Sequence, residues 1–312
     1  MGIALWLVPK SHSLFYESAD SLIISLHTLF DNAPTFEPHI TITSGIVINT
    51  PSDVAVLLNS ALAAINSLNQ IHQQRREEQQ QQRKQMENQS DTSLNDNNTN
   101  ISESSSENAI SDQLILFDKL EFGKKYFQKV KLSVYPNPNL VSFARIIREL
   151  FVEAPGLKQR VLQQSSSLAP PSNDRPKRSK SLSKRVASNS SALSSATSES
   201  TEGGSSTTLS GEINPADISS LAMKAAERWS LEEFNPHLSL VYSNVYAIDS
   251  ALERTIKTRV EDLLSVLIDG DNRLVDDAAN LYWPDDGCLK LVRCEGEVKD
   301  WEVLGSIDYH LT

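Results

Sequence analysis

The sequence predicts an α+β fold made of two lobes. Helical and strand patterns alternate along most of the chain, but the last two apolar segments, 288–298 and 301–311, follow each other without a helix between them. Consecutive strands favour an α+β arrangement over a doubly wound parallel sheet. A helix followed by a strand that opens with Pro-His occurs once in each half of the chain. We therefore expect a bilobal body with two antiparallel sheets flanked by helices.

The first half of the chain contains four elements that can be recognised by their periodicity. An apolar strand at 3–9 ends at Pro9, and a strand at 39–48 alternates apolar and polar residues. Apolar residues at helical spacing predict helices at 18–32 and 52–69. Ser18 and Ser52 stand at the expected N-caps of these helices.

The second half continues the same mixture of helices and strands. Two strands within 114–136 are expected to turn at Gly123, and the final pair of strands turns near Gly296. The remaining strand is expected at 237–243. Helices are predicted at 137–152, 216–231 and 247–267.

Two polar inserts interrupt what we interpret as one domain spanning 1–312. The insert at about 72–111 is rich in Gln and then in Asn and Ser, and the insert at about 159–213 is rich in Ser and Pro. Such compositions cannot bury a core and predict disorder, although the Gln-rich part could extend the preceding helix. The basic patch at 175–185 fits a nuclear address, a phosphorylated segment or a solvated linker.

Net charge and cysteine content limit the function classes. A formal charge of −11 argues against broad binding to nucleic acid, so we expect no stable nucleic-acid complex. Cys288 and Cys294 are too far apart on an extended strand to form a disulfide, which fits a reducing compartment. No apolar run is long enough to span a membrane and no secretory signal is recognisable. We expect an intracellular, mainly cytoplasmic monomer.

Two matched histidine segments carry the chemistry. PHITITS places His39 two residues before Thr41, and PHLSLVYS places His237 two residues before Ser239. Residues i and i+2 of a strand share one face, so each segment presents an imidazole beside a hydroxyl. His310 also has a threonine two residues later, but it lacks the preceding proline and is interpreted as coincidental.

Two facing imidazoles and two hydroxyls suit the opening of a cyclic phosphodiester. One histidine can take a proton from the attacking water while the other protonates the leaving oxygen, without a metal or other cofactor. The hydroxyls of Thr41 and Ser239 can donate to the non-bridging oxygens. The sequence does not decide which of His39 and His237 is the acid and which is the base.

These residues resemble the 2H phosphoesterase superfamily, whose signature is two H-x-[ST]-x motifs, and within it the fungal and plant cyclic nucleotide phosphodiesterases. The match covers the folded core through ALWLVP, FEPHITITSG and NPHLSLVYS. The resemblance implies that His39 and His237 are the acid–base pair and that Thr41 and Ser239 bind phosphate. It also places Tyr242 near the phosphate, which requires a bulge or a strand end, and Trp6 near the cleft, either stacked on a base or in the core.

The resemblance further implies a substrate class. It predicts hydrolysis of ADP-ribose 1″,2″-cyclic phosphate, a by-product of tRNA splicing, to ADP-ribose 1″-phosphate. Nucleoside 2′,3′-cyclic phosphates would open to 2′-phosphates. Family members need no metal, and the fungal members leave an association with the Golgi open.

Three alternatives compete with this interpretation. An enzyme of the same superfamily could process RNA ends, for which the basic run 124–131 would serve as a groove. A non-catalytic nucleotide-binding protein would bind the cyclic phosphate without turning it over. A zinc protein using His39 and His237 lacks a third ligand at a known spacing.

Overall fold

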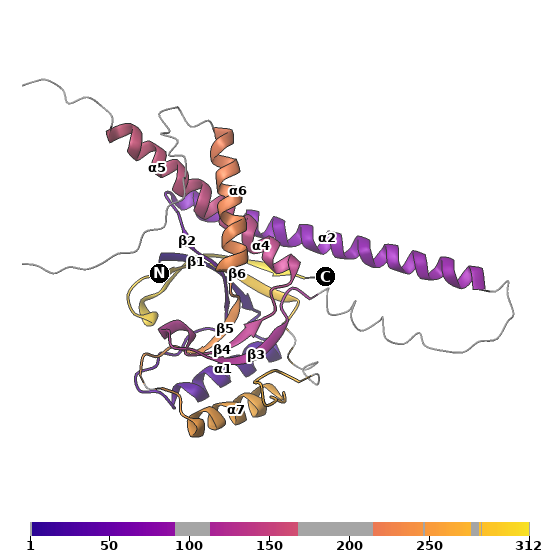
Figure 1. Ribbon diagram of the computed structural model, residues 1–312, viewed down its shortest axis with the longest axis vertical. Helices are drawn as coiled ribbons and strands as arrows, with labels where there is room; N and C mark the ends of the chain where they lie inside the picture. The colour runs from indigo at the N-terminus through magenta and orange to yellow at the C-terminus, as the bar shows by residue number, and fades with distance from the viewer. Residues whose placement is uncertain are drawn as a thin grey trace, which may run out of the picture.

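A computed structural model describes residues 2–90, 113–167, 215–245, 247–275, 281 and 283–311 (Figure 1). Of the inserts predicted at about 72–111 and 159–213, the parts at 91–111 and 168–213, with the basic patch at 175–185, lie outside these residues. Residues 159–167 are helical, so the disorder predicted for them was wrong. The described part is an α+β structure, as predicted.

The strands form one seven-stranded antiparallel sheet with the order β3-β4-β5-β2-β1-β6-β7. The expectation of two separate sheets was therefore wrong. The sheet is nevertheless weakly joined at its centre, where a single residue pair, Ile40–Leu238, links β2 to β5. The two lobes expected from the sequence correspond to two parts of one sheet, β3-β4-β5 and β2-β1-β6-β7. These parts meet between β5 and β2, a junction called the central seam below. The strands are β1 (Gly2–Pro9), β2 (Ile40–Ile46), β3 (Phe117–Phe122), β4 (Val130–Val134), β5 (His237–Val241), β6 (Asp286–Cys294) and β7 (Glu302–His310).

Most helices begin and end close to the predicted residues, with several differences. The first helix spans Leu14 to His27 and is capped by Ser13, whose hydroxyl accepts from the Tyr16 amide, so the predicted cap at Ser18 was wrong. The second helix begins at Pro51, which places Ser52 inside the helix, so the predicted cap at Ser52 was also wrong. The second helix continues through the Gln-rich run to Ser90, and a helix enters the second insert as far as Ser167. The helices are α1 (Leu14–His27), α2 (Pro51–Ser90), α4 (Pro138–Arg148), α5 (Ala154–Ser167), α6 (Pro215–Glu232) and α7 (Ser250–Leu264), with a π-helical turn η2 (Glu149–Glu153) and 3₁₀ turns η1 (Tyr126–Gln128) and η4 (Val298–Asp300).

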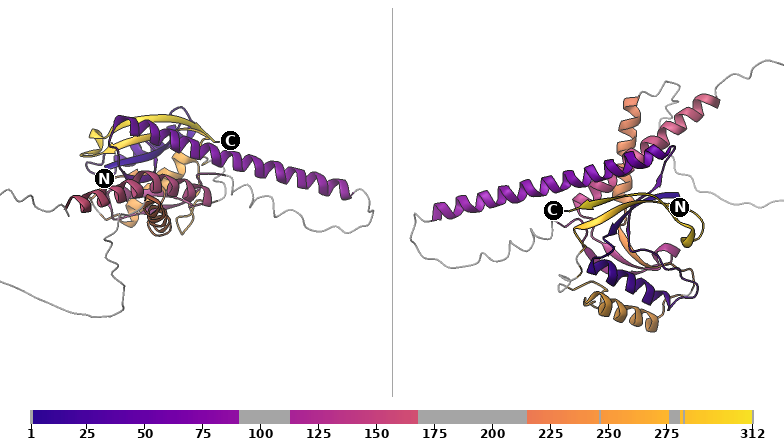
Figure 2. Two further views of the ribbon diagram at one scale, coloured as in Figure 1. Left: turned by 90° about the horizontal axis from the view of Figure 1, so that it is seen from above. Right: turned by 180° about the vertical axis from the view of Figure 1, so that it is seen from behind.

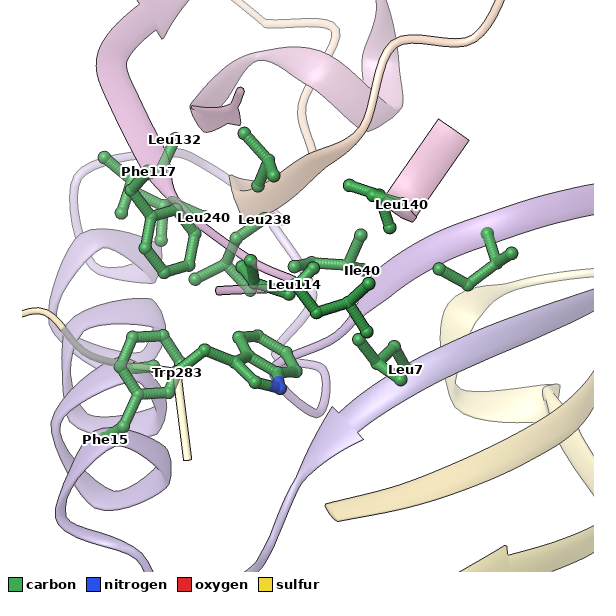
Figure 3. Close-up of a cluster of buried hydrophobic side chains, with 14 of the residues drawn as sticks. Leu7, Phe15, Ile40, Leu114, Phe117, Leu132, Leu140, Leu238, Leu240 and Trp283 are labelled. Atoms are coloured by element: carbon green, nitrogen blue, oxygen red, sulfur yellow. The ribbon is translucent and has the colours of Figure 1, made fainter. Parts of the chain in front are cut away.

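The helices cover one face of the sheet. Helix α1 packs on α7 and on β5, while α4 contacts β2 and α2 contacts β6 and β7 (Figures 1 and 2). The covered face is lined by alternate strand residues, such as Leu7, Ile40 and Leu238, which are fully buried with Phe143 of α4 (Figure 3 shows part of this core). The opposite face curves inward and carries the histidine side of each motif.

Contrary to the expectation from the sequence, one described helical segment, Pro51–Ile71 in α2, has the length and apolar composition that a membrane span would need. Four of its side chains are buried in the core beneath the sheet: Leu57, Leu58, Ala61 and Ile65. Its most buried stripe is therefore used for packing on β6 and β7. The distal part of α2 extends beyond the sheet (Figure 2).

Candidate active site

The two histidine motifs meet at the central seam of the sheet. Ile40 pairs with Leu238, and both side chains are fully buried on the helix-covered face. Continuing this antiparallel register by one residue in each direction sets His39 opposite Ser239 and Thr41 opposite His237. Because neighbouring residues of a strand point to opposite faces, these four side chains share the uncovered face. Side chains directly opposite each other across such a pair have Cβ atoms about 5 Å apart.

Both histidines are held in the same way by the backbone that precedes them. The Nδ1 atom of His39 lies 2.7 Å from the Glu37 carbonyl oxygen, and that of His237 lies 2.7 Å from the Asn235 carbonyl oxygen. A carbonyl only accepts, so each Nδ1 carries the proton that it donates. Each Nε2 is left as the atom that can exchange a proton with a ligand. The two Pro-His segments therefore share the same local geometry as well as the same sequence pattern.

Burial gives the two histidines different environments. His39 is only 4 % exposed, and desolvation lowers its pKa to about 4, an effect that the bond to the Glu37 carbonyl opposes and that the charges of His237 and Lys290 reinforce. His237 is partly exposed, and its pKa is also lowered, mainly by desolvation and then by the Lys131 charge. Both rings are consequently neutral at pH 7.

A lysine–glutamate pair lies beside each histidine. The Lys290 Nζ contacts both carboxylate oxygens of Glu37 at 2.6 and 2.8 Å, next to His39. The Lys131 Nζ contacts the Glu121 carboxylate at 2.8 Å, and Lys131 is the cross-strand neighbour of Ser239. Lys119 also contacts Glu121, at 3.1 Å, so the cluster near His237 has one more cation than anion. This local excess of positive charge can attract a phosphate in a chain of net charge −11.

Tyr242 reaches the site through an irregularity in β5. The β4–β5 register shifts between Ser239 and Val241, so one extra residue of β5 is accommodated there. The shift, together with the end of the strand at Val241, brings Tyr242 to the face of His39 despite its odd spacing from His237. Its hydroxyl lies 3.5 Å from the His39 Nε2, at the outer limit of a hydrogen bond. Burial raises the pKa of Tyr242, and a hydrogen bond with Ser239 opposes this, so the phenol stays protonated at neutral pH.

Trp6 stacks on His39 with ring centroids 3.7 Å apart and an interplanar angle of 13°. It is 6 % exposed and pairs across the sheet with Thr41 on one side and Lys290 on the other. One face of the indole is therefore used to hold the imidazole. Of the two roles weighed for this tryptophan, packing against the site is the one that its burial supports.

The remaining predicted residues also lie at this centre. The Ser239 hydroxyl donates to the Phe127 carbonyl oxygen at 2.8 Å, and Thr41 is half-buried between Trp6 of β1 and His237 of β5. His310, the third histidine with a threonine two residues later, lies away from the seam at the end of β7, where its Nδ1 contacts Asp286 at 2.7 Å. Among the described residues, no three His, Cys, Asp or Glu side chains are placed to hold a metal ion. Metal independence stays a prediction.

The family model for cyclic phosphodiesterase-like proteins matches residues 1–309. This chain belongs to that family. Proteins named 2′,3′-cyclic-nucleotide 3′-phosphodiesterase resemble it over almost its whole length. The Candida albicans protein is 34 % identical and the Debaryomyces hansenii protein 36 % identical, covering 99 % and 93 % of this chain and all of each relative. The Saccharomyces cerevisiae protein is 28 % identical over 99 % of this chain and all of the relative.

The structure adds aromatic residues to the site of this cyclic phosphodiesterase-like protein that the sequence did not single out. Phe36 stacks on Tyr242 with centroids 3.8 Å apart. Trp301 lies 5.7 Å from Trp6 and 6.1 Å from Tyr242, so it spans the two parts of the sheet. Its Nε1–H is buried and has no acceptor among the described residues. Phe36 lies three residues before His39, so the sequence could have indicated that it belongs to the site. Trp301 begins an ordinary strand pattern, and nothing in the sequence connects it with the histidine motifs.

Proposed function

We propose that this protein hydrolyses five-membered cyclic phosphodiesters of ribose. Nucleoside 2′,3′-cyclic phosphates would open to 2′-phosphates, and ADP-ribose 1″,2″-cyclic phosphate to ADP-ribose 1″-phosphate, as in the removal of a by-product of tRNA splicing. The observation that supports the proposal most directly is the pairing of His39 and His237 on one face of the sheet, each with a hydroxyl opposite. The names of the fungal relatives support the part of the proposal that concerns 2′,3′-cyclic nucleotides.

The proposed reaction uses the two imidazoles on opposite sides of the phosphorus. One neutral Nε2 accepts a proton from water as the water oxygen bonds to phosphorus. The other histidine, protonated when the substrate binds, gives its proton to the ribose oxygen as that oxygen's bond to phosphorus breaks. One histidine takes up a proton and the other releases one, so the total charge of the pair does not change. Proton exchange with solvent then restores the starting protonation state of each histidine.

The hydroxyls supply the donors that the phosphate oxygens need. Thr41 and Ser239 stand diagonally across the seam, each opposite a histidine. A phosphate at the centre can accept from Thr41, and from Ser239 once that hydroxyl turns away from the Phe127 carbonyl to which it donates in this structure. The excess positive charge near Lys131 favours the phosphodiester anion at this position. Only the phosphorus–oxygen bond on the side of the protonated histidine breaks, so one of the two possible phosphomonoesters forms.

Loss of either hydroxyl should weaken catalysis less than loss of a histidine. We expect Thr41→Val and Ser239→Ala each to lower kcat/KM for 2′,3′-cyclic AMP by about 10- to 100-fold, the value of one hydrogen bond to a charged group. Steady-state kinetics measure this effect. Thr43→Val, in the same strand but farther from His237, is the control. Equal losses in all three variants would mean that the hydroxyls act only on the structure of β2 and β5.

Product analysis tests the proposed function itself. The protein is incubated in EDTA with 2′,3′-cyclic AMP, with ADP-ribose 1″,2″-cyclic phosphate and with a short RNA that ends in a 2′,3′-cyclic phosphate. Phosphorus NMR and chromatography identify the products. We expect 2′-AMP and ADP-ribose 1″-phosphate to form much faster than the opened RNA end. A 3′-phosphate product, a requirement for added metal, or binding without turnover would contradict the proposal.

A further inference from the structure

The two hairpin tips of the sheet meet over the uncovered face. Turn η1 connects β3 to β4, and η4 connects β6 to β7, so the tips belong to opposite ends of the strand order. The curvature of the sheet brings them to the same side of the molecule (Figure 1). Phe127 of η1 lies 5.9 Å from Trp301, which follows η4, as measured between ring centroids.

A cavity of about 650 Å³ lies between these tips. Tyr126 and Phe127 line it from η1, and Val298 and Lys299 line it from η4. The amide side chains of Asn32 and Asn244 complete its polar edge, and both residues are exposed. The cavity therefore combines aromatic surface with groups that can both donate and accept hydrogen bonds.

The cavity adjoins the candidate catalytic centre. Phe127, which lines the cavity, accepts through its carbonyl oxygen from Ser239, and the Tyr126 ring centroid is 5.9 Å from that of Tyr242. A ligand whose phosphate contacts Ser239 can thus extend its attached group into this cavity. Trp6 is not available for that group, because it is buried and stacked on His39.

We propose that the cavity between the hairpin tips is the subsite for the nucleobase of the substrate, with the Tyr126 ring as its stacking surface. The inference rests on the proposed function, because it takes the cyclic phosphate to bind between His39 and His237. Planar heterocycles stack well on aromatic side chains, and their edges carry the donors and acceptors that asparagine amides match. Glu297 and Lys299, which both line the cavity, form an ion pair at 2.6 Å, so the charges of these two lining residues compensate each other, as suits a neutral base.

The test compares substrates with and without a base. Wild type, Tyr126→Ala and Tyr126→Phe are assayed with 2′,3′-cyclic AMP and with methyl β-riboside 2,3-cyclic phosphate, in which a methoxy group replaces the base. We expect Tyr126→Ala to raise KM for 2′,3′-cyclic AMP by about tenfold or more, the value of one stacked base, with kcat nearly unchanged. The base-free substrate should be turned over equally by all three proteins. Tyr126→Phe should behave as wild type, because it keeps the ring.

Exposed Tyr135, in the segment that follows β4, provides a matched control, and Tyr135→Ala should change neither substrate. If Tyr126→Ala raised KM by a similar factor for both substrates, or changed KM for neither, the proposed subsite would be overturned. Equilibrium dialysis of 2′-AMP and of methyl riboside 2-phosphate separates this outcome from failure of the proposed function. If wild type has no turnover but Tyr126→Ala binds 2′-AMP about tenfold more weakly, the subsite stands and the activity is wrong. Unchanged binding of 2′-AMP would refute the subsite whatever the turnover.

Discussion

Replacing either histidine of the central pair with alanine should lower kcat/KM for 2′,3′-cyclic AMP by about 10²- to 10⁴-fold, the range for losing a general acid or base. His39 and His237 each leave Nε2 free while Nδ1 donates to a backbone carbonyl, so each can act as only one partner in proton transfer. The double variant should lose little more than the poorer single variant, because the two groups act in one step. Steady-state kinetics on the purified proteins measure these losses.

His310→Ala is the matched control for this experiment. His310 is followed by a threonine at the same spacing but lies at the end of β7 beside Asp286. Its loss should leave kcat/KM within about twofold of wild type, since a surface substitution away from the site has little effect. Near-normal turnover in His39→Ala or in His237→Ala would remove that histidine from the mechanism. Circular dichroism on each variant shows whether a loss of activity follows from a loss of fold.

The buried imidazole of His39 should make the stability of the protein depend on pH. Its pKa is about 4 in the folded state, chiefly because of desolvation, and 6.5 is its ordinary value. Between these two values the unfolded chain binds a proton that the folded chain does not, so stability is complete above about pH 6.5 and falls as the pH drops toward 4. From pH 7.5 to 4.5 this one group should reduce the free energy of unfolding by about 2–3 kcal/mol.

Urea unfolding of wild type and His39→Gln at both pH values isolates this contribution. Other titrating groups affect both proteins, so the pH-dependent loss should be smaller in the variant by about 2–3 kcal/mol. Ile40→Val is the control, because the next residue of the strand is fully buried but cannot titrate. Its stability should be lower than that of wild type by the same amount at both pH values. A variant of His39 that keeps the full wild-type pH dependence would show that the imidazole is solvated in the folded protein.

Much of the fold could be predicted because its signals are local. The alternation in PHITITS and in PHLSLVYS determined which residues share a face, and helical spacing placed most helices within a few residues of their observed bounds. The cap of α1 was misplaced because Ser13 and Ser18 both precede apolar residues, and only the observed bond from the Tyr16 amide distinguishes them. Helix α2 continues into the Gln-rich insert since Gln, Glu, Arg and Lys favour helix even without a core to pack against.

The sequence by itself determined that each motif presents a histidine beside a hydroxyl, and that Tyr242 needs an irregular strand to join them. Only the tertiary structure decided that the two motifs are neighbours in one sheet, with Ile40 opposite Leu238. It also decided that Tyr126 and Trp301, on distant hairpins, both approach Tyr242. The physical reason is that alternation fixes the face of a side chain, whereas strand order, register and sheet curvature depend on packing between segments far apart in the chain.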